Sequence, residues 1–202
     1  MEKKITKYEN NIQDRTKLDY LKGLAARYIS YLRNQYIVRV ARKNGAIVGE
    51  CVSMPYKLAK NANANLIIGN HTSIQTDRID LRARVQIGNH VIIGADVQII
   101  TCSHDLDSMD FEYKTYGLVI DDYCWLATRV FVLPSCRKIE YGAVCGAGSV
   151  VVKNVNHMEI VTGNPARLLR IRKIVHKNVC VESFLGNDYL AYKAANKSNL
   201  TR

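Results

Sequence analysis

The chain has 202 residues, of which 48% are hydrophobic, so it can bury the core of one domain with an extension or of two small domains. It carries 29 Lys and Arg against 18 Asp and Glu, and the resulting net charge of +11 favours a polyanionic or phosphorylated partner. The sequence lacks helix-turn-helix, zinc-finger and single-strand-binding signatures, which argues against nucleic acid as that partner.

The six cysteines and the N-terminal segment bear on the cellular compartment. Cys124, Cys136 and Cys145 fall on inward positions of a repeat that spans residues 65–166, so small apolar core residues are predicted and not a disulfide framework. No CxxC pair occurs, so no structural zinc site is predicted. The first ten residues, MEKKITKYEN, do not resemble a signal peptide, and no apolar run reaches the length of a membrane span. A reducing, cytoplasmic location is therefore expected.

The N-terminal part, residues 1–64, is predicted to be a helical and β lead-in. Residues 1–13 are polar and are expected to be irregular, and Asp14 is a candidate N-cap for a basic helix that ends near Arg33. An apolar stripe recurs along this helix at intervals of three and four, at Leu18, Leu21, Ala25, Tyr28 and Leu32. The helix either packs on the rest of the chain or on a neighbouring subunit, or rests on an anionic membrane surface. Residues 36–40 are rich in β-forming side chains and are expected to be extended.

The central part, residues 65–166, repeats with a period of six. Ile87, Ile93 and Ile99 are six apart, and Gly follows the first two. A small or β-branched residue stands four places after each apolar one, and Cys124 and Cys136 occupy such positions. A period of six fits neither an α-helix nor an indefinitely continued strand. It predicts an all-β domain, a parallel β-helix whose hexads each form one short strand and a corner.

One segment interrupts this rhythm. The loop at residues 105–118, DLDSMDFEYKTYGL, can leave the stack only at a corner, where no strand is unpaired, and a long loop in a compact domain is usually functional. The repeats end at GNPA, residues 163–166, and residues 167–202 form a basic tail predicted to hold one short helix.

His104 directly precedes this loop and is the candidate catalytic residue. An imidazole can take a proton from an alcohol or an amine near neutral pH. Two alternatives stay open. Zinc could be bound by three of the five histidines, but these lack a His-x4-His pair (His71, His90, His104, His157, His176). Cys102 could act as a nucleophile, because it lies on the same side of an extended strand as His104.

The repeats and several local motifs resemble those of the hexapeptide-repeat acyltransferases. The motifs are Ser-His-Asp at residues 103–105, WLA at 125–127, VLP at 132–134, GAVCGAGSVV at 142–151 and GNPA at 163–166. The similarity is strongest to the O-acetyltransferases of sugars and surface polysaccharides, such as the galactoside, maltose, nodulation-factor and colanic-acid enzymes. It covers about residues 65–172, roughly half of the chain.

The resemblance implies a left-handed β-helix, a homotrimer with active sites between subunits, and acetyl-CoA as the donor, without a metal. His104 matches the catalytic base of the family. Six positions match donor-binding residues: Trp125 lines the pantetheine channel, Thr128, Ala147 and Val152 touch the pantetheine arm, and Arg167 and Arg170 lie near the 3′-phosphate ADP group.

The acceptor site departs from the family pattern. Galactoside enzymes place an Asn about thirty residues before the His, where this chain has Ile74. Gln75, Asp77 and Asp105 are instead the candidate acceptor-binding residues. The sequence therefore predicts transfer of an acetyl group to a carbohydrate hydroxyl with His104 as general base. N-acylation of an amino-sugar nucleotide, O-acetylation of serine and a non-catalytic binding or assembly module remain alternatives.

Overall fold

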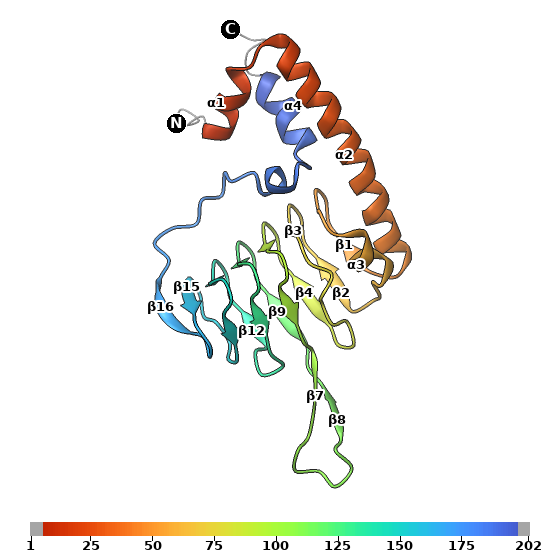
Figure 1. The fold of residues 1–202 in the computed structure, drawn as a ribbon, viewed down its shortest axis with the longest axis vertical. Coiled ribbons are helices and arrows are strands. Elements are labelled where there is room, and N and C mark those ends of the chain that lie inside the picture. The colour runs from red at the N-terminus through yellow and green to blue at the C-terminus, as the bar shows by residue number, and fades with distance from the viewer. Residues whose placement is uncertain (1–5, 198–202) are drawn as a thin grey trace.

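The computed structural model describes residues 6–197, and the chain winds through three parallel sheets in turn (Figure 1). The first sheet contains, in spatial order, β1 (Ile47–Val48), β2 (Leu66–Ile68), β4 (Val85–Ile87), β9 (Leu118–Ile120) and β12 (Lys138–Ile139). The second contains β3 (Ser73–Ile74), β5 (Ile92–Ile93), β10 (Trp125–Leu126), β13 (Val144–Cys145), β15 (Glu159–Thr162) and β16 (Arg167–Ile171). The third contains β6 (Gln98–Ile99), β11 (Phe131–Val132) and β14 (Val150–Val151). The strands β4, β5 and β6 enter the first, second and third sheets in turn, as do β9, β10 and β11 and then β12, β13 and β14, so the predicted parallel β-helix is confirmed.

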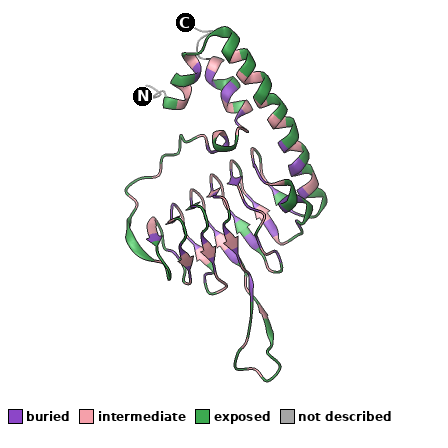
Figure 2. Cartoon of the chain, in the orientation of Figure 1, coloured by how far each residue is buried: buried purple, intermediate pink, exposed green. Residues whose placement is uncertain are grey.

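The core consists of the first residues of the hexads, stacked in register. In the first sheet Ile68, Ile87, Ile120 and Ile139 pair one above another, and each is at most 2% exposed. Figure 2 shows this buried interior along the whole stack of coils. The three repeat-region cysteines, Cys124, Cys136 and Cys145, are buried as the hexad positions predict.

The first coil begins earlier than predicted. β1 pairs in parallel with β2, with Ile47 opposite Ile67, so the stacking starts at residue 47 and not at about residue 65. The hexad rhythm does not reveal this coil because α3 (Tyr56–Lys60) interrupts it. The lead-in and the β-helix therefore overlap in this structure.

The corners between the first and second sheets are held by a ladder of side-chain carbonyls. The Oδ1 atoms of Asn70, Asn89 and Asp122 accept the main-chain N–H groups of Glu50, Asn70 and Asn89 at 2.8, 2.8 and 2.7 Å. Gly88 lies beside this ladder, and a Cβ there would meet the Asp122 nitrogen at 2.8 Å. Glycine is required at this corner because the next coil approaches so closely.

Two helices precede the β-helix, and both begin at a capping threonine. Thr6 and Glu9 form a capping box at the start of α1 (Lys7–Gln13), a segment within the residues expected to be irregular. The side chain of Thr16 accepts the N–H of Asp19 at the start of α2 (Lys17–Lys43), so the predicted N-cap at Asp14 is wrong.

The helix α2 is longer than predicted and buries a different face. It continues through residues 36–40, which were expected to be extended, because Ile37, Val38 and Ala41 pack against the first coil. Most of the predicted stripe is exposed: Leu18, Leu21 and Leu32 are each at least half exposed, whereas the ring of Tyr28 contacts that of Tyr189 at 5.2 Å between centroids. Among the described residues, no helix is long and apolar enough to cross a bilayer.

The C-terminal tail returns to the N-terminal helices. The basic tail begins with β16, which is antiparallel to β15. The chain then passes outside the coils to a 3-10 helix, η1 (Val181–Leu185), and to α4 (Tyr189–Lys197). This last helix is the short helix predicted in the tail. It packs on α1 and α2, so both ends of the chain lie at one end of the molecule (Figure 1).

The contact between the helices is polar and aromatic. Arg27 Nε donates to the buried Asp188 at 2.9 Å, and the Arg27 guanidinium lies 4.1 Å from the ring centroid of Tyr192. Tyr192 is fully buried, and a Cβ on Gly23 would meet its hydroxyl at 2.5 Å. Gly23 thus permits the close approach of α4 to α2.

Candidate active site

The segment after His104 is a protruding hairpin arm and not an irregular loop. β7 (Cys102–His104) and β8 (Tyr113–Thr115) pair antiparallel, with His104 opposite Tyr113. The arm, residues 102–115, leaves the corner between the third and first sheets and extends away from the coils (Figure 1). Because the departure is at a corner, β6 and β9 on either side keep their parallel partners.

The base of the arm is fixed to the preceding coil by Asp80. Its carboxylate accepts the main-chain N–H of Thr101 at 3.0 Å, the Cys102 thiol at 3.2 Å and two N–H groups of Arg82 at 2.8 and 3.0 Å. Burial opposes ionisation of Asp80, but these hydrogen bonds outweigh it and hold the pKa of the carboxyl well below its usual range. The ionised carboxylate therefore fixes the direction in which the arm leaves the coil.

The imidazole of His104 is oriented by the main chain. Its Nδ1 lies 2.8 Å from the carbonyl oxygen of Phe111, and an acceptor-only partner requires Nδ1 to carry the hydrogen. Nε2 is then the nitrogen with a free lone pair. The ring stacks on Phe111 at 4.3 Å between centroids and meets the edge-on ring of Tyr113 at 5.4 Å. This exposed imidazole is arranged as a proton acceptor.

The neighbours of His104 in sequence do not orient it. Asp105 pairs with Lys114 and accepts the N–H of Asp107 at 3.1 Å; the hydrogen bond from Lys114 is the main cause that holds the pKa of Asp105 below its usual value. Cys102 is buried, and its thiol is directed to Asp80. Neither side chain contributes to a relay with the imidazole.

The candidate donor-binding residues lie elsewhere on the coils. Trp125 stands on the outer side of the second sheet and is 48% exposed. Thr128 and Ala147 are exposed at the corner between the second and third sheets, and they lie on successive coils, because the N–H of Gly148 donates to the Thr128 carbonyl at 3.0 Å. Val152 is half-buried just after the third sheet. A hollow of about 420 Å³ adjoins the Thr128 corner and is lined by Arg78, Asp96, Gln98, Arg129, Val130, Phe131 and Val150.

The two candidate phosphate ligands are exposed on β16. Arg167 and Arg170 each donate to a main-chain carbonyl of a neighbouring residue, at 2.9 and 3.3 Å. Within the described part of the chain neither has a carboxylate partner. Both guanidinium groups can therefore turn toward a bound phosphate without breaking an ion pair.

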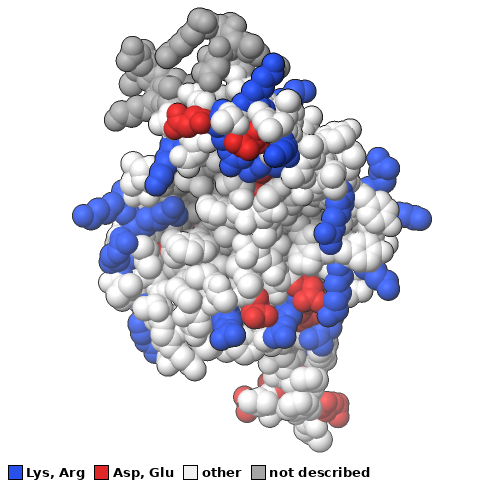
Figure 3. All heavy atoms as spheres, turned by 45° about the horizontal axis from the view of Figure 1, so that its top comes forward, with Lys and Arg blue, Asp and Glu red and all other residues white. Residues whose placement is uncertain are grey.

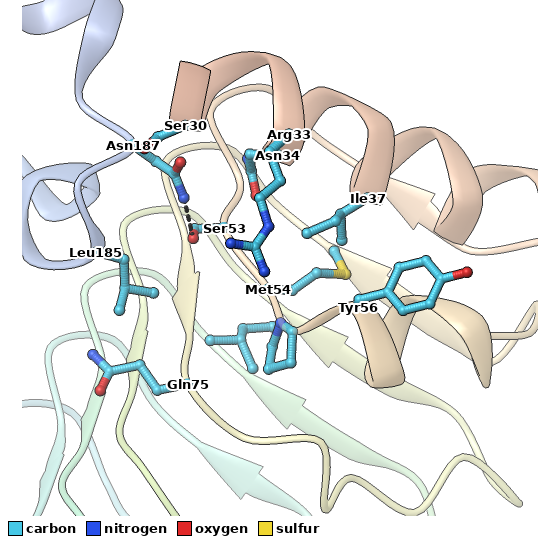
Figure 4. A pocket seen from close by; sticks show the side chains of 12 residues that line it. Ser30, Arg33, Asn34, Ile37, Ser53, Met54, Tyr56, Gln75, Leu185 and Asn187 are labelled. Atoms are coloured by element: carbon cyan, nitrogen blue, oxygen red, sulfur yellow. Dashed lines mark hydrogen bonds between the residues drawn. The ribbon is translucent and has the colours of Figure 1, made fainter. Parts of the chain in front are cut away.

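Two of the candidate acceptor residues lie near the N-terminal end of the coils. Gln75 contributes to a pocket of about 350 Å³ between α2, the first coils and the residues after η1, lined by Ser30, Arg33, Asn34, Ile37, Ser53, Met54, Pro55, Tyr56, Ile74, Gln75, Leu185 and Asn187 (Figure 4). Asp77 lies two residues on but pairs with Lys57 at 2.6 Å, and this hydrogen bond is the main cause that lowers its pKa. Arg33, Asn34, Gln75 and Asn187 give the pocket polar groups, beside a larger apolar part of the lining.

A single chain does not bring these groups together. His104 leaves the corner between the third and first sheets, whereas Trp125 lies on the second sheet and Thr128 and Gln75 lie at the corner between the second and third. The arm also exposes apolar side chains, with Leu106 79% exposed and Met109 fully exposed. Figure 3 shows acidic side chains on the protruding arm and Lys and Arg spread over the rest of that face.

Comparison with known proteins identifies the family. No protein-family model matches the chain. A putative colanic acid biosynthesis acetyltransferase of Escherichia coli strain K12 is 33% identical over 129 residues, which make up 63% of this chain and 70% of that protein. The chain belongs to the hexapeptide-repeat acetyltransferases. A galactoside O-acetyltransferase of Lactococcus lactis is 37% identical over 88 residues, 42% of each chain.

Solved structures of this acetyltransferase family share the fold. A hexapeptide-repeat acetyltransferase of Vibrio cholerae is 25% identical, with a TM-score of 0.60 over 84% of this chain and 95% of that one. In its complex with acetyl coenzyme A the TM-score is 0.54 at 26% identity, over 82% and 84% of the two chains. A galactoside acetyltransferase in complex with coenzyme A reaches 0.51 at 18% identity over 84% of each chain, which shows the fold alone.

Some residues of the candidate site were not predicted from the sequence. Asp80 was not predicted, although the coil register contains the signal: Ile79 is opposite Ile99, so Asp80 must lie near Thr101. The carbonyl of Phe111 leaves no trace in residue identity, because every residue has one. The pocket residues Asn34 and Asn187 come from α2 and the returning tail, whose packing no repeat encodes.

Proposed function

We propose that this acetyltransferase moves an acetyl group from acetyl-CoA to a hydroxyl of a sugar or of a surface-polysaccharide precursor, with His104 as general base. The observation that carries the proposal is the hydrogen bond between His104 Nδ1 and the Phe111 carbonyl, which leaves Nε2 free to accept a proton. Family membership and the colanic acid and galactoside relatives support the reaction class and the acceptor class. We also propose that the β-helix winds in the left-handed sense, as its resemblance to the hexapeptide-repeat acyltransferases implies.

The reaction is a direct transfer. Nε2 of His104 takes the proton of the acceptor hydroxyl as its oxygen attacks the thioester carbonyl of acetyl-CoA. A tetrahedral oxyanion forms and collapses, the C–S bond breaks, and the imidazolium returns the proton to the leaving thiolate. The products are the acetyl ester and coenzyme A. The buried thiol of Cys102, directed to Asp80, does not suit a covalent intermediate.

The donor is bound along the coils. In this proposal Trp125 lines the channel for the pantetheine arm, and Thr128, Ala147 and Val152 contact the arm. Arg167 and Arg170 bind the phosphates of the 3′-phosphate ADP group, for which their exposure and lack of carboxylate partners among the described residues suit them. The order of these residues from Trp125 to β16 follows the stack toward its last coil.

The active site is shared between subunits of a homotrimer. His104 and the donor-binding residues lie on different sides of the β-helix, and the arm exposes Leu106, Met109 and Phe111. A large exposed apolar surface favours a partner, and an acidic arm on a chain of net charge +11 favours a second copy of the same chain. The exposed stripe of α2 is available for the same assembly. No feature of the described residues favours a membrane surface over a neighbouring subunit.

The acceptor enters the pocket lined by Gln75. Arg33, Asn34, Gln75 and Asn187 offer donors and acceptors there, and Asn187 already donates to Ser53 at 2.6 Å (Figure 4). We assign Asp77, and Asp105 of the docked arm, to the rim of this pocket. Each carboxylate is already paired with a lysine, so neither is free to bind the acceptor deep in the pocket. In the trimer the arm of a neighbouring subunit brings His104 to this pocket. A cytoplasmic location, where acetyl-CoA is made, completes the proposal.

The test is a thiol-release assay with acetyl-CoA and a panel of acceptors. Neutral sugars and polysaccharide precursors should release coenzyme A faster than the uncatalysed rate, with ester formation verified by mass spectrometry. Faster release with amino-sugar nucleotides or with serine would replace the acceptor class and keep the enzyme class. Failure to bind coenzyme A in calorimetry would refute the enzyme and leave a binding or assembly module.

A further inference from the structure

A column of side chains runs along the corner between the first and second sheets. Strand register places Cys51, His71, His90 and Tyr123 at equivalent positions of successive coils. All four have left-handed backbone conformation, with φ of 53°, 53°, 55° and 60°. Their side chains therefore leave the corner in the same direction. The rings of His71 and His90 stack at 4.9 Å between centroids, as do those of His90 and Tyr123.

The returning tail places a carboxylate against the top of this column. η1 contacts β3, and Glu182 on η1 is buried at 8% exposure. One of its carboxylate oxygens contacts His71 Nδ1, and the other accepts the Cys180 thiol at 3.3 Å. Cys51 Sγ, His71 Nδ1 and a Glu182 oxygen all lie within 4.8 Å of one another. Three segments distant in sequence thus contribute one cluster of donor atoms.

These donor atoms are those of a transition-metal site. A thiolate, an imidazole nitrogen and a carboxylate oxygen are the ligand types of Zn²⁺, which binds four donors in a tetrahedral arrangement. We propose that Cys51, His71 and Glu182 bind a zinc ion that fastens the C-terminal tail to the first two coils. The Cys180 thiol donates to the same carboxylate at 3.3 Å, and we assign it, or a water molecule, as the fourth ligand. This site is separate from His104, which leaves a different corner of the coil.

An ion pair between His71 and Glu182 would not account for the whole cluster. It leaves unexplained why two thiols flank a buried carboxylate. A divalent cation among these donors would bind the thiolates and the carboxylate together, with release of the thiol protons to solvent.

The pattern of cysteine burial makes the site easy to observe. Cys51 and Cys180 are partly exposed, whereas Cys102, Cys124, Cys136 and Cys145 are buried. The full-length reduced protein, stripped with a chelator, is titrated with Zn²⁺ against a chromophoric chelator, and with Co²⁺ in the absorption spectrometer. We expect one ion per chain and a thiolate-to-cobalt charge-transfer band. Zn²⁺ should also protect Cys51 and Cys180 from alkylation, mapped by peptide mass spectrometry, and raise the melting temperature.

Single variants decide whether the named residues form the site. C51S should abolish the contribution of its thiolate to the charge-transfer band. H71F should lower the affinity for the ion while it keeps the ring stacked on His90. E182Q should also lower the affinity, with little change in the size of the side chain. Each should lose at least tenfold in affinity, the order found for ligand-sphere changes. C180S should lose less, because water can replace its thiol.

Matched controls are C102S and H157A, which remove a cysteine and a histidine outside the cluster. Both should bind the ion as the unmodified protein does. Three results would overturn the proposal: no stoichiometric binding of Zn²⁺ or Co²⁺, a cobalt spectrum unchanged in C51S, or alkylation of Cys51 that Zn²⁺ does not slow. Because the readouts are binding, spectra and thiol protection, they do not depend on acetyl transfer.

Discussion

At the scale of single residues, the orientation of the His104 imidazole, the proposed general base, depends on a main-chain group. The Phe111 carbonyl, fixed by the hairpin, takes the place that a carboxylate side chain often occupies. A substitution at Phe111 removes the stacked ring but keeps the carbonyl. We therefore expect F111A to impair catalysis less than H104A.

Replacement of His104 tests the proposed base directly. H104A should lower kcat by about 10²–10⁴-fold, the usual contribution of a positioned general base, with coenzyme A binding by calorimetry unchanged. Binding persists because the donor is held by the coils and β16. C102A is the control and should keep most of its turnover. The opposite result, an inactive C102A and an active H104A, would indicate an acyl-thioester intermediate.

Asp80 gives a prediction with a defined pH dependence. D80N should lower the free energy of unfolding by about 2 kcal/mol at neutral pH, since it weakens hydrogen bonds to a charged group. The folded-state pKa of Asp80 is depressed, so the stabilisation is fully present above the unfolded-state pKa and is lost as the pH falls toward the folded value. Denaturant titrations of both proteins should therefore differ by a constant free energy of unfolding between pH 7 and about pH 4, and this difference should shrink only as the pH falls further toward the folded-state pKa. A difference that stays constant well below about pH 4 would contradict this role of the carboxylate.

At the scale of elements, sequence reasoning succeeded where the period is strict. The hexads from Ile87 to Ile99 fixed the strands and inward residues, because each apolar position must stack on its counterpart in the next coil. The arm was expected to be an irregular loop. Its strands pair only with each other, so no third strand or buried face imposes a visible alternation. His104 was predicted to be catalytic from its place at the start of this element, and its role stays a prediction.

The antiparallel edge strand β16 carries the donor prediction. R167A and R170A should each raise KM for acetyl-CoA about tenfold or more with a smaller change in kcat, because a charged hydrogen bond to phosphate contributes about 1.5–3 kcal/mol. Initial-rate kinetics at saturating acceptor would measure this. R39A, on an exposed arginine of α2 away from β16, serves as a comparison and should leave KM unchanged. If KM stays the same in both β16 variants, the basic strand serves another purpose.

The hairpin arm predicts a dependence of activity on assembly. The unmodified protein should have the mass of three chains by light scattering, and replacement of Leu106 and Met109 by Ser should shift it toward monomer and lower activity together. L190S removes an exposed leucine from α4 and is the matched control. A fully active monomer would exclude an active site shared between subunits.

At the scale of the whole molecule, the coils could be predicted from the sequence, whereas the packing of the helices on one another could not. The repeat is a local signal, read within a few tens of residues. The packing of α4 on α1 and α2 joins residues more than a hundred and fifty positions apart, as in the contact of Arg27 with Asp188, and no sequence period encodes it. The first coil was missed for a related reason, since its partner strand β2 stabilises it and its own hexads are broken by α3.

The path of the tail changes how the stack can come apart. A solenoid in which each coil contacts only its neighbours frays from its two ends. Here the tail leaves β15 and β16 at the last coil and packs through η1 and α4 on the first coils and α2, so neither end is free. The tail therefore connects the two ends of the stack, and the coils at one end cannot separate unless the tail is released from the other end.

A β-helix whose two ends are connected in this way should unfold in a single transition, with nearly uniform protection of its amides from hydrogen exchange along the stack. Lys177 is exposed between β16 and η1. Cleavage at a protease site inserted after it would break the connection between the two ends of the stack without removing a residue. The terminal coils should then exchange faster than the central ones. In this enzyme the tail would make the coils unfold together as one cooperative unit, instead of one after another from the ends of the stack.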